Sequence, residues 1–237
     1  MKVIILAGGL GTRIRAAAGD LPKSLIPIAG KPFIAYQLQQ LRQSGVQRVV
    51  LCIGYQGDHI RAVVGNGSHW GLEVHYVDEG TQLQGTGGAL RLAGDQGMLD
   101  PLFFMLYGDS FLPIDFLPIL VYFNSRIEAA LMTVMRNQGQ WDQCNVCFDG
   151  SKVTRYDKEK AGTAGMEYID YGLSLRWRDP MLGHIPAERP YDLAAYFKAL
   201  SASGDLAGDN VQQRFYEIGS MAGLQDFKYY VDKGGHA

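Results

Sequence analysis

The chain begins with the stretch MKVIILAGGLGTR, residues 1–13, which carries the clearest indication of its fold. Its apolar run KVIIL has the length and composition of a strand that is buried on both faces of a sheet. A glycine-rich turn follows the run at once, and an arginine closes it: Gly8, Gly9, Gly11 and Arg13. A buried strand that ends in such a turn is typical of α/β folds, which bind their ligands at the carboxyl ends of the strands.

Segments with strand and helix patterns alternate along the first half of the chain. Residues 32–45 have apolar side chains at helical spacing, with Pro32 in the first turn and Gly45 after the last. The other segments are a strand at 46–54, a helix at 58–65, a strand at 72–78, a helix at 86–92 and an apolar strand at 101–109. This alternation predicts βαβ units and a parallel sheet.

The pattern of the second half is less regular. Strands are expected at 129–134, 145–150, 152–157, 167–175 and 214–219, and helices at 193–204 and 221–233. No linker, low-complexity segment or internal repeat interrupts the sequence. We therefore expect one domain over residues 1–237, of the α/β class, with a mixed, mostly parallel central sheet flanked by helices.

Composition excludes several classes of protein. Hydrophobic residues make up 47% of the 237 residues and charged residues 19%, which supports a folded core, and the net charge of -2 does not favour nucleic-acid binding. Cys52, Cys144 and Cys147 are too few for a disulfide framework, and a single C-x-x-C pair makes no zinc site. Because no apolar run approaches the ~18 residues of a membrane span and no signal-peptide pattern is present, we expect a cytoplasmic protein without a membrane partner.

The glycine turn has three interpretations besides a bare tight turn. A dinucleotide fingerprint needs a third glycine where Ile14 stands, and a Walker A loop needs a lysine that the turn lacks. The remaining interpretation is a loop whose amides wrap a triphosphate while Arg13 grips its oxygens. Three glycines within four positions cost backbone entropy, which favours a phosphate site over a turn without a ligand.

A second unusual segment, LPKSLIP, occupies residues 21–27. Pro22 holds Leu21 extended and fixes the chain at the approach to Lys23. A lysine between prolines and apolar residues is poorly placed for the surface, so the segment suits the wall of a pocket.

Together, GGLGTR at 8–13 and LPKSLIPIAGKP at 21–32 resemble the signature of sugar-1-phosphate nucleotidylyltransferases. The resemblance continues in the family's order through GTGGAL (85–90), YGD (107–109), YDK (156–158) and YEIG (216–219). The form GTGGAL is most similar to heptose- and mannose-1-phosphate guanylyltransferases. The resemblance implies a Rossmann-like nucleotidyltransferase fold in which residues 1–135 mainly bind the nucleotide and residues 136–237 mainly bind the sugar phosphate.

The reaction that the resemblance implies joins an NTP to a sugar 1-phosphate and releases pyrophosphate. The resemblance implies that Arg13 binds the β and γ phosphates, because a planar guanidinium suits phosphate oxygens. It implies that Lys23 binds the α-phosphate. With Asp109 these two residues form the expected catalytic set. The further nucleotide contacts that it implies are Leu6, Ala7, Gly8, Gly9, Gly11, Thr12, Gly85, Thr86, Gly87, Gly88 and Gly108.

The GTGG segment is expected to face the base of the nucleotide. Its glycines would let the backbone bond the base edge, and Gln82 or Gln84 are further candidates. Thr86 would cap the helix that follows.

Two carboxylates are expected to hold Mg²⁺. Asp109 ends the apolar strand at 101–109, where α/β folds place ligand chemistry, although a helix cap is an alternative role. Glu217 matches the position of the family's second metal carboxylate, and its alternative is an edge-strand residue that faces solvent. Mg²⁺ favours one or two carboxylates together with phosphate oxygens.

The sugar-phosphate end is expected at Lys158, Gly172 and Asp170. Lys158 matches the lysine of the family's acid–lysine pair, with Asp157 as the acid, and Lys160 is its rival. Gly172 matches a strand glycine that lines the sugar pocket, and Asp170 stands where the family has an amide.

Three other functions compete with this one. The acceptor could be a phosphorylated alcohol or cyclitol, or the chain could be a catalytically silent homologue that binds a nucleotide sugar. A dinucleotide-dependent oxidoreductase is the weakest, because the third glycine is missing. Because members of the family often assemble, a homo-oligomer is among the expected states.

Overall fold

The computed structural model describes residues 1–9, 11, 14, 19, 21–187 and 189–235. The chain forms two compact units that are interleaved along the sequence. The first unit is Met1–Leu83, Leu106–Ile114 and Arg214–Ala237, and the second is Gln84–Met105 and Asp115–Gln213. The expected division at residue 135 concerned the ligands, and it stays a prediction.

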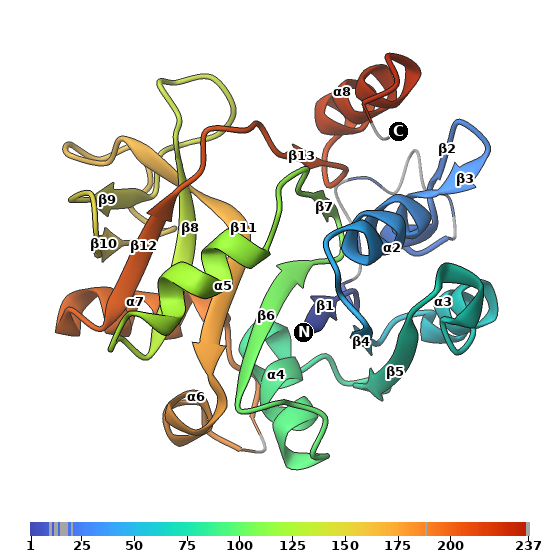
Figure 1. The fold of residues 1–237 in the computed structure, drawn as a ribbon, viewed down its shortest axis with the longest axis horizontal. Helices are drawn as coiled ribbons and strands as arrows, with labels where there is room; N and C mark the ends of the chain where they lie inside the picture. The colour runs from blue at the N-terminus through green and yellow to red at the C-terminus, as the bar shows by residue number, and fades with distance from the viewer. Residues whose placement is uncertain (10, 12–13, 15–18, 20, 188, 236–237) are drawn as a thin grey trace. The chain divides into compact units, whose positions relative to one another are not determined.

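The first unit is built on a parallel sheet. Strand β1 (Lys2–Leu6) pairs with β4 (Arg48–Ile53), and β4 pairs with β5 (Glu73–Asp78), both in parallel (Figure 1). Val3, Ile4 and Ile5 have no exposed surface, so the strand predicted from the opening residues is confirmed as buried on both faces.

The helices of this unit lie close to the predicted ranges 32–45, 58–65 and 221–233. Helix α2 (Phe33–Gln43) starts directly after Pro32, and α3 is Gly57–Val64. Gly45, two residues beyond α2, has a φ of 77°, which favours glycine. Shorter elements are η2 (Lys23–Leu25), β2 (Pro27–Ile28), β3 (Lys31–Pro32) and η3 (Ser68–Trp70).

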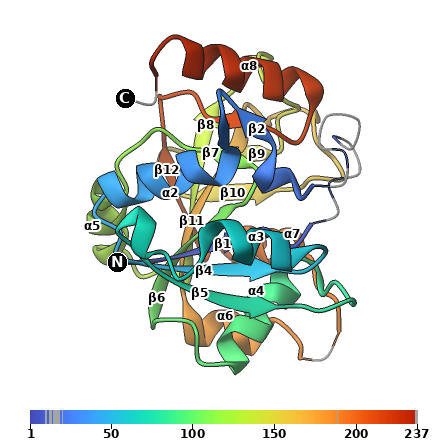
Figure 2. The same cartoon turned by 90° about the vertical axis from the view of Figure 1, so that its right-hand side faces the viewer.

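An aromatic cluster anchors the last helix of the chain. Helix α8 (Met221–Asp232) follows the short strand β13 (Tyr216–Glu217), which pairs antiparallel with β7 (Ser110–Phe111). The ring of Phe227 lies 5.1 Å from that of Phe33 and 5.0 Å from that of Phe111. Figure 2 shows α8 beside α2, as these contacts require. Aromatic packing therefore fixes β13 and β7 to the body of the unit.

The second unit contains a mixed sheet. Strands β8 (Ala130–Arg136) and β11 (Tyr168–Trp177) are antiparallel, whereas β12 (Leu206–Asn210) is parallel to β8. Strands β9 (Val146–Phe148) and β10 (Val153–Tyr156) pair antiparallel. The sequence did not predict β12, because LAGDN has one large apolar residue. Its Gly208 lies against the ring of Phe148, where a Cβ would stand 2.6 Å from Cδ2.

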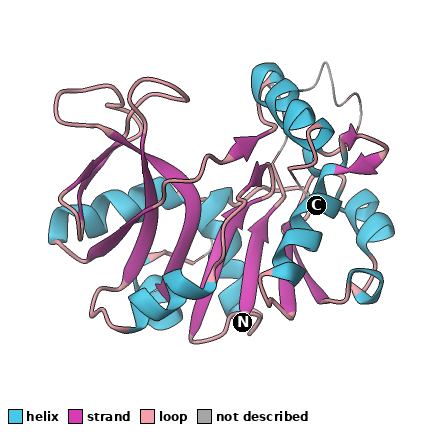
Figure 3. Cartoon of the chain, turned by 45° about the horizontal axis from the view of Figure 1, so that its top comes forward, coloured by secondary structure: helices cyan, strands magenta, loops and turns pink. Residues whose placement is uncertain are grey.

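Four helices belong to the second unit as described: α4 (Gly85–Asp95), α5 (Leu117–Asn124), α6 (Arg178–His184) and α7 (Leu193–Ser203). Two of them, α5 and α6, were not predicted, because α5 is apolar on nearly every side and α6 contains a proline and a glycine. Strand β6 (Leu102–Tyr107) begins in the second unit and ends in the first. Figure 3 shows the strands together with the helices, and the parallel and antiparallel pairs confirm the predicted α/β class with its mixed, Rossmann-like sheet.

The sequence predicted neither a membrane-spanning helix nor a disulfide framework, and the structure bears on both only within the residues that it describes. In these ranges, every helix is too short or too polar to cross a membrane. Cys52 is buried, Cys144 and Cys147 are half-buried, and none of the three forms a disulfide within the described residues.

A buried carboxylate ties β8 to the turn before β10. Glu128 is 2% exposed, and it accepts hydrogen bonds from Arg126 at 2.7 Å and from Lys152 at 3.1 Å. Burial would raise its pKa, but the bonds from Arg126, a backbone N–H and Lys152 outweigh burial and lower the pKa of Glu128 to about 2.

We expect Glu128→Gln to lower the free energy of unfolding at pH 7 by about 2 kcal/mol, because charged hydrogen bonds are lost. The folded pKa is depressed, so this stabilisation is present above the ordinary value of 4.5 and is lost as the pH falls towards 2. Urea unfolding of both proteins at pH 7, 5 and 3 measures it. A difference that does not narrow at pH 3 would contradict the assignment.

Candidate functional site

The glycine turn after β1 packs against two polar side chains of the first unit. A Cβ on Gly8 would stand 2.5 Å from Oε1 of Glu79, and a Cβ on Gly11 would stand 2.7 Å from Cγ of Lys23. Gly11 has a φ of 62°, whereas a Cβ on Gly9 would meet nothing within 4 Å. The first and third glycines are therefore required by close packing, and the second faces open space.

Two residues of the turn predicted to contact the nucleotide are not placed. Thr12 and Arg13 lie outside the described residues. The triphosphate role of Arg13 and the nucleotide contact of Thr12 therefore stay predictions.

Lys23 and Asp109 form an ion pair although 86 positions separate them. Lys23 Nζ donates to Asp109 Oδ2 at 2.6 Å, and the side chains are 21% and 23% exposed. Lys23 begins the 3-10 turn η2, in which Leu25 N donates to Pro22 O at 2.9 Å. The proline therefore fixes the turn that presents the lysine, as the segment around Pro22 predicted.

The end of β6 lies directly beside the end of β1. Gly108 N donates to Leu6 O at 2.9 Å, and a Cβ on Gly108 would stand 2.9 Å from Cα of Ala7. Three residues predicted to contact the nucleotide thus come together at the carboxyl edge of the sheet, where α/β folds bind ligands.

A buried glutamine fixes the backbone on both sides of Asp109. Gln37 is 2% exposed, and its Nε2 donates to Tyr107 O at 3.0 Å and to Ser110 O at 2.7 Å. A side-chain amide that bonds two carbonyls of one turn stabilises that turn's shape. Helix α2, which carries Gln37, therefore positions Asp109.

The carboxylate of Glu217 accepts hydrogen bonds from residues that closely follow it in the sequence. Oε2 accepts from Gly219 N at 2.5 Å and from Ser220 N at 3.1 Å, and Oε1 accepts from Ser220 Oγ at 2.5 Å. Ile218 N donates to Asp109 O at 2.9 Å. This backbone hydrogen bond joins the segments that carry Glu217 and Asp109, which pair through β13 and β7.

The two carboxylates differ in how well they fit a magnesium ion. In the ranges that the structure describes, no three His, Cys, Asp or Glu side chains gather as a metal site. Asp109 uses Oδ2 for Lys23, while its Oδ1 has no hydrogen bond among the described residues, which suits an ion that takes its other ligands from phosphates and water. Glu217 already has both oxygens bonded, so it does not fit as a ligand in this arrangement.

Within the second unit, the GTGG segment (residues 85–88) is hydrogen-bonded to Tyr191, just before α7. We call this set of bonds the clasp. Gly87 N and Gly88 N donate to Tyr191 O at 2.8 and 3.1 Å, and Tyr191 N donates to Gln84 O at 2.8 Å. A Cβ on Gly85, where φ is 73°, would stand 2.8 Å from Tyr191 O. These glycines are therefore needed for the clasp. Their contact with a base stays a prediction, although two of their N–H groups are already bonded.

The predicted capping role of Thr86 is wrong. Residue Gln84 stands at the start of α4, and no side chain caps that helix. Thr86 Oγ1 instead donates to Asp192 Oδ1 at 3.0 Å and accepts from Leu193 N at 2.8 Å. The threonine thus lies inside the first turn of α4, and its hydroxyl holds the beginning of α7.

Lys158, Asp170 and Gly172 are brought together in the second unit. The register of β11 against β8 shifts between Asp170 and Ser174, and Gly172 within this irregularity has a φ of 100°. Gly172 N donates to Asp170 Oδ1 at 2.9 Å. Burial raises the pKa of Asp170, and the charge of Lys158 opposes the rise. An exposed lysine therefore stands within electrostatic reach of this carboxylate.

Asp157, the acid next to Lys158, has a structural role. It is 5% exposed, its Oδ2 pairs with Lys198 Nζ at 2.9 Å, and its Oδ1 accepts from Glu159 N at 3.1 Å. The hydrogen bond from Lys198 holds the pKa of Asp157 below its ordinary value. Asp157 therefore shapes the turn that presents Lys158 and Lys160, both of which are exposed.

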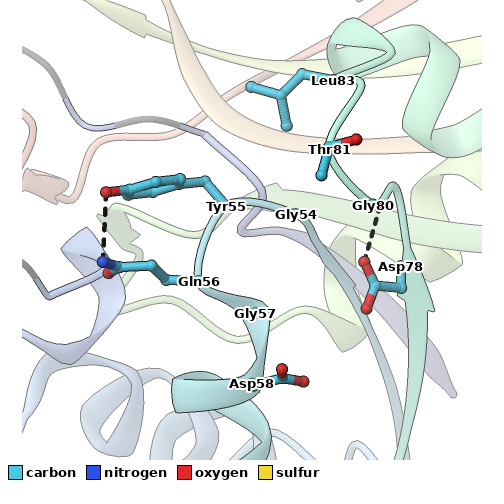
Figure 4. Close-up of a pocket in the computed structure, with 9 residues that line it drawn as sticks. All are labelled: Gly54, Tyr55, Gln56, Gly57, Asp58, Asp78, Gly80, Thr81 and Leu83. Carbon is cyan, nitrogen blue, oxygen red and sulfur yellow. Dashed lines mark hydrogen bonds between the residues drawn. The ribbon is translucent and has the colours of Figure 1, made fainter.

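A cavity of about 390 Å³ opens beyond the ends of β4 and β5 in the first unit (Figure 4). Gln56 has a φ of 56°, and its Nε2 donates to the Tyr55 hydroxyl at 3.3 Å. A Cβ on Gly54 would stand 3.3 Å from Gly8 O, so the cavity adjoins the glycine turn. Its lining residues are Gly54, Tyr55, Gln56, Gly57, Asp58, Asp78, Gly80, Thr81 and Leu83. The sequence did not predict this cavity.

Several positioning residues were missed by the sequence analysis. Gln37 and Tyr191 act through backbone groups far away in the chain, which no local pattern reveals. Asp192 had a local signal, because an aspartate before an apolar helical run is typical of an N-cap, and its Oδ1 accepts from Ala194 N at 2.9 Å.

Comparison with known proteins gives a family match over most of the first unit and into the second. The family model described as nucleotidyl transferase matches residues 2–142. D-glycero-alpha-D-manno-heptose 1-phosphate guanylyltransferase of Aneurinibacillus thermoaerophilus is 42% identical over 93 residues, which cover 39% of this chain and 40% of that protein. Glucose-1-phosphate thymidylyltransferase of Streptomyces griseus is 41% identical over 83 residues, or 35% of this chain and 23% of that one. The chain thus spans less than half the length of either relative.

A solved structure shares the fold over nearly the whole chain. HddC from Yersinia pseudotuberculosis superposes with a TM-score of 0.79, covering 97% of this chain and 99% of its own, at 22% identity. At this identity the similarity concerns the fold alone.

We expect Thr86→Val to loosen the clasp, because the substitution removes both bonds of the hydroxyl and costs about 1–3 kcal/mol. Hydrogen exchange at Gly87 and Gly88 should become at least about fivefold faster, since their N–H groups bond Tyr191 in the clasp. Thr86→Ser keeps the hydroxyl and is the matched control. Equal exchange in both variants would show that the threonine does not hold the segment.

Proposed function

The chain belongs to the nucleotidyl transferase family, and from this premise we propose that it transfers a nucleotidyl group from an NTP to a sugar 1-phosphate. The products are an NDP-sugar and pyrophosphate. The observation that carries the proposal is the Lys23–Asp109 pair, packed against Gly11 at the edge of the sheet. It supplies a cation for phosphate and a carboxylate for a metal at one place.

In the proposed reaction, a phosphate oxygen of the sugar phosphate attacks the α-phosphorus of the NTP. The new oxygen–phosphorus bond forms as the bond to the β-phosphate breaks, and pyrophosphate leaves with that oxygen. A phosphate monoester is already a good nucleophile, so the protein supplies position and charge rather than a strong base. Lys23 stabilises the charge that develops at the α-phosphate.

We propose Asp109 as the protein ligand of a magnesium ion. Within the described part of the chain its Oδ1 accepts no hydrogen bond, and Lys23 orients the carboxylate through Oδ2. When bound, Mg²⁺ would neutralise phosphate charge and orient the leaving group. Arg13 keeps its proposed role at the β and γ phosphates, because a bidentate guanidinium suits the departing group.

The second unit supplies the residues proposed for the sugar phosphate. Lys158 is the cation on a turn fixed by Asp157, and Asp170 with Gly172 forms a polar wall nearby. A carboxylate beside a sugar binds hydroxyl groups, since each carboxylate oxygen accepts them.

We propose GTP as the nucleotide and a heptose or mannose 1-phosphate as the acceptor. The motif GTGGAL supports this choice, as does the heptose-phosphate guanylyltransferase that matches 39% of the chain. The thymidylyltransferase match at a similar identity makes dTTP with glucose 1-phosphate the first alternative to test.

We expect purified protein with Mg²⁺ to release pyrophosphate from one pair in a panel of NTPs and sugar 1-phosphates. Lys23→Ala should lower this rate at least about a hundredfold, because a group that stabilises transition-state charge is lost. Lys31→Ala, at an exposed lysine, is the matched control and should keep the rate. EDTA should abolish release. A Lys23→Ala protein with the wild-type rate would overturn the proposal.

A second prediction separates Lys158 from Lys160. We expect Lys158→Ala to raise KM for the sugar phosphate at least about tenfold, which corresponds to about 1.4 kcal/mol of lost binding, with KM for the NTP unchanged. Lys160→Ala, two residues away on the same turn, should change neither KM. If instead Lys160→Ala raised KM for the sugar phosphate and Lys158→Ala did not, the contact would be assigned to Lys160.

A further inference from the structure

We infer that Glu217 is a positioning residue for Asp109 and not a second metal ligand. The inference rests on the role proposed for Asp109. It concerns the first unit alone, where β13, β7 and the start of α8 meet.

The carboxylate of Glu217 is held by three donors that belong to the beginning of α8. Gly219 N and Ser220 N donate to one oxygen at 2.5 and 3.1 Å, and Ser220 Oγ donates to the other at 2.5 Å. Ser220 Oγ also accepts from Gly223 N at 3.0 Å, as an N-cap does. The carboxylate and the serine therefore form one cap at the positive end of the helix dipole.

Gly223 leaves the space that the side chain of Glu217 fills. A Cβ at Gly223 would stand 2.6 Å from Cδ of Glu217 and 2.5 Å from its backbone oxygen. The glutamate thus lies directly on the first turn of α8. A carboxylate turned towards a metal ion would give up these donors, and the N–H groups of buried Gly219 and half-buried Ser220 would lose their partner.

The cap is connected to Asp109 through one strand pair. Glu217 stands opposite Ser110 in the ladder of β13 and β7, and Ile218 N donates to Asp109 O at 2.9 Å. Ile218 has no exposed surface, and it packs in the same apolar cluster as Leu224 of α8. The cap therefore holds β13 in its place beside β7. This fixes the backbone of Asp109 and positions the carboxylate that bonds Lys23.

Metal affinity distinguishes a ligand from a positioning residue. We expect Glu217→Gln to leave the dissociation constant for Mn²⁺, titrated alone and followed by its EPR signal, within about twofold of wild type. Asp109→Asn should raise it at least about tenfold. Equal losses in both variants would make Glu217 a ligand and overturn the inference.

Thermal unfolding tests the cap without any substrate. Glu217→Gln and Ser220→Ala should each lower Tm by about 2–4 °C, as expected for about 1 kcal/mol in a chain of this size. The double variant should lose less than the sum, because the two residues bond each other. Strictly additive losses would contradict the cap.

Turnover tests the positioning. We expect Glu217→Gln to lower kcat about tenfold, with KM for the NTP within about twofold, because a displaced Asp109 acts mainly on the transition state. Val231→Ala, a buried residue of α8 far from the cap, should lower Tm and keep kcat. Loss of kcat in both variants would leave only a structural role for Glu217 and overturn the inference.

The outcomes also separate this inference from the proposed function. Wild-type protein that releases no pyrophosphate from any pair overturns the function, while the Mn²⁺ titration and the Tm comparison still decide the role of Glu217. Wild-type protein that binds no Mn²⁺ removes the metal from the proposed function, and the Tm comparison then decides the cap.

Discussion

The 2.6 Å ion pair between Lys23 and Asp109 is the interaction on which the candidate site of the first unit depends. An ion pair at this partial exposure contributes little net stability, because desolvation offsets most of the attraction. Its geometry is maintained by the surroundings instead. The lysine stem lies on Gly11, and Gln37 bonds the carbonyls on both sides of the aspartate. The fold thus holds opposite charges together at the edge of the sheet, at the place where we propose that phosphate binds.

Missing Cβ atoms make these approaches possible. Gly8, Gly11 and Gly108 each lie where a methyl group would stand less than 3 Å from a neighbouring atom. In the second unit, Gly85 does the same for the carbonyl of Tyr191. Glycine in these positions allows backbone and side chains to pack closely. A loop that did not pack against its neighbours would not require glycine there.

One helix of the second unit positions two predicted substrate segments. At the start of α7, Asp192 and Leu193 bond Thr86, which lies in the GTGG segment. In its middle, Lys198 pairs with Asp157 beside Lys158. A rigid helix that bonds both segments fixes their separation within the unit, which suits a reaction that depends on placing two phosphorylated substrates.

The order of most strands and helices was predictable from the amino-acid sequence, because apolar patterns, prolines and glycines are local signals. The motifs also predicted Lys23 and Asp109 as site residues, and the structure brings these two side chains together. The sequence did not reveal β12, whose small and polar residues carry no strand pattern, or α5, whose apolar residues show no helical face. The hydrogen bonds of Thr86 and Glu217 became visible only in the folded chain: Thr86 bonds Asp192 and Leu193, which are far away in the sequence, whereas Glu217 bonds its close neighbours Gly219 and Ser220. A hydroxyl or carboxylate takes the nearest donors that folding supplies, and these distances do not exist until the chain has folded.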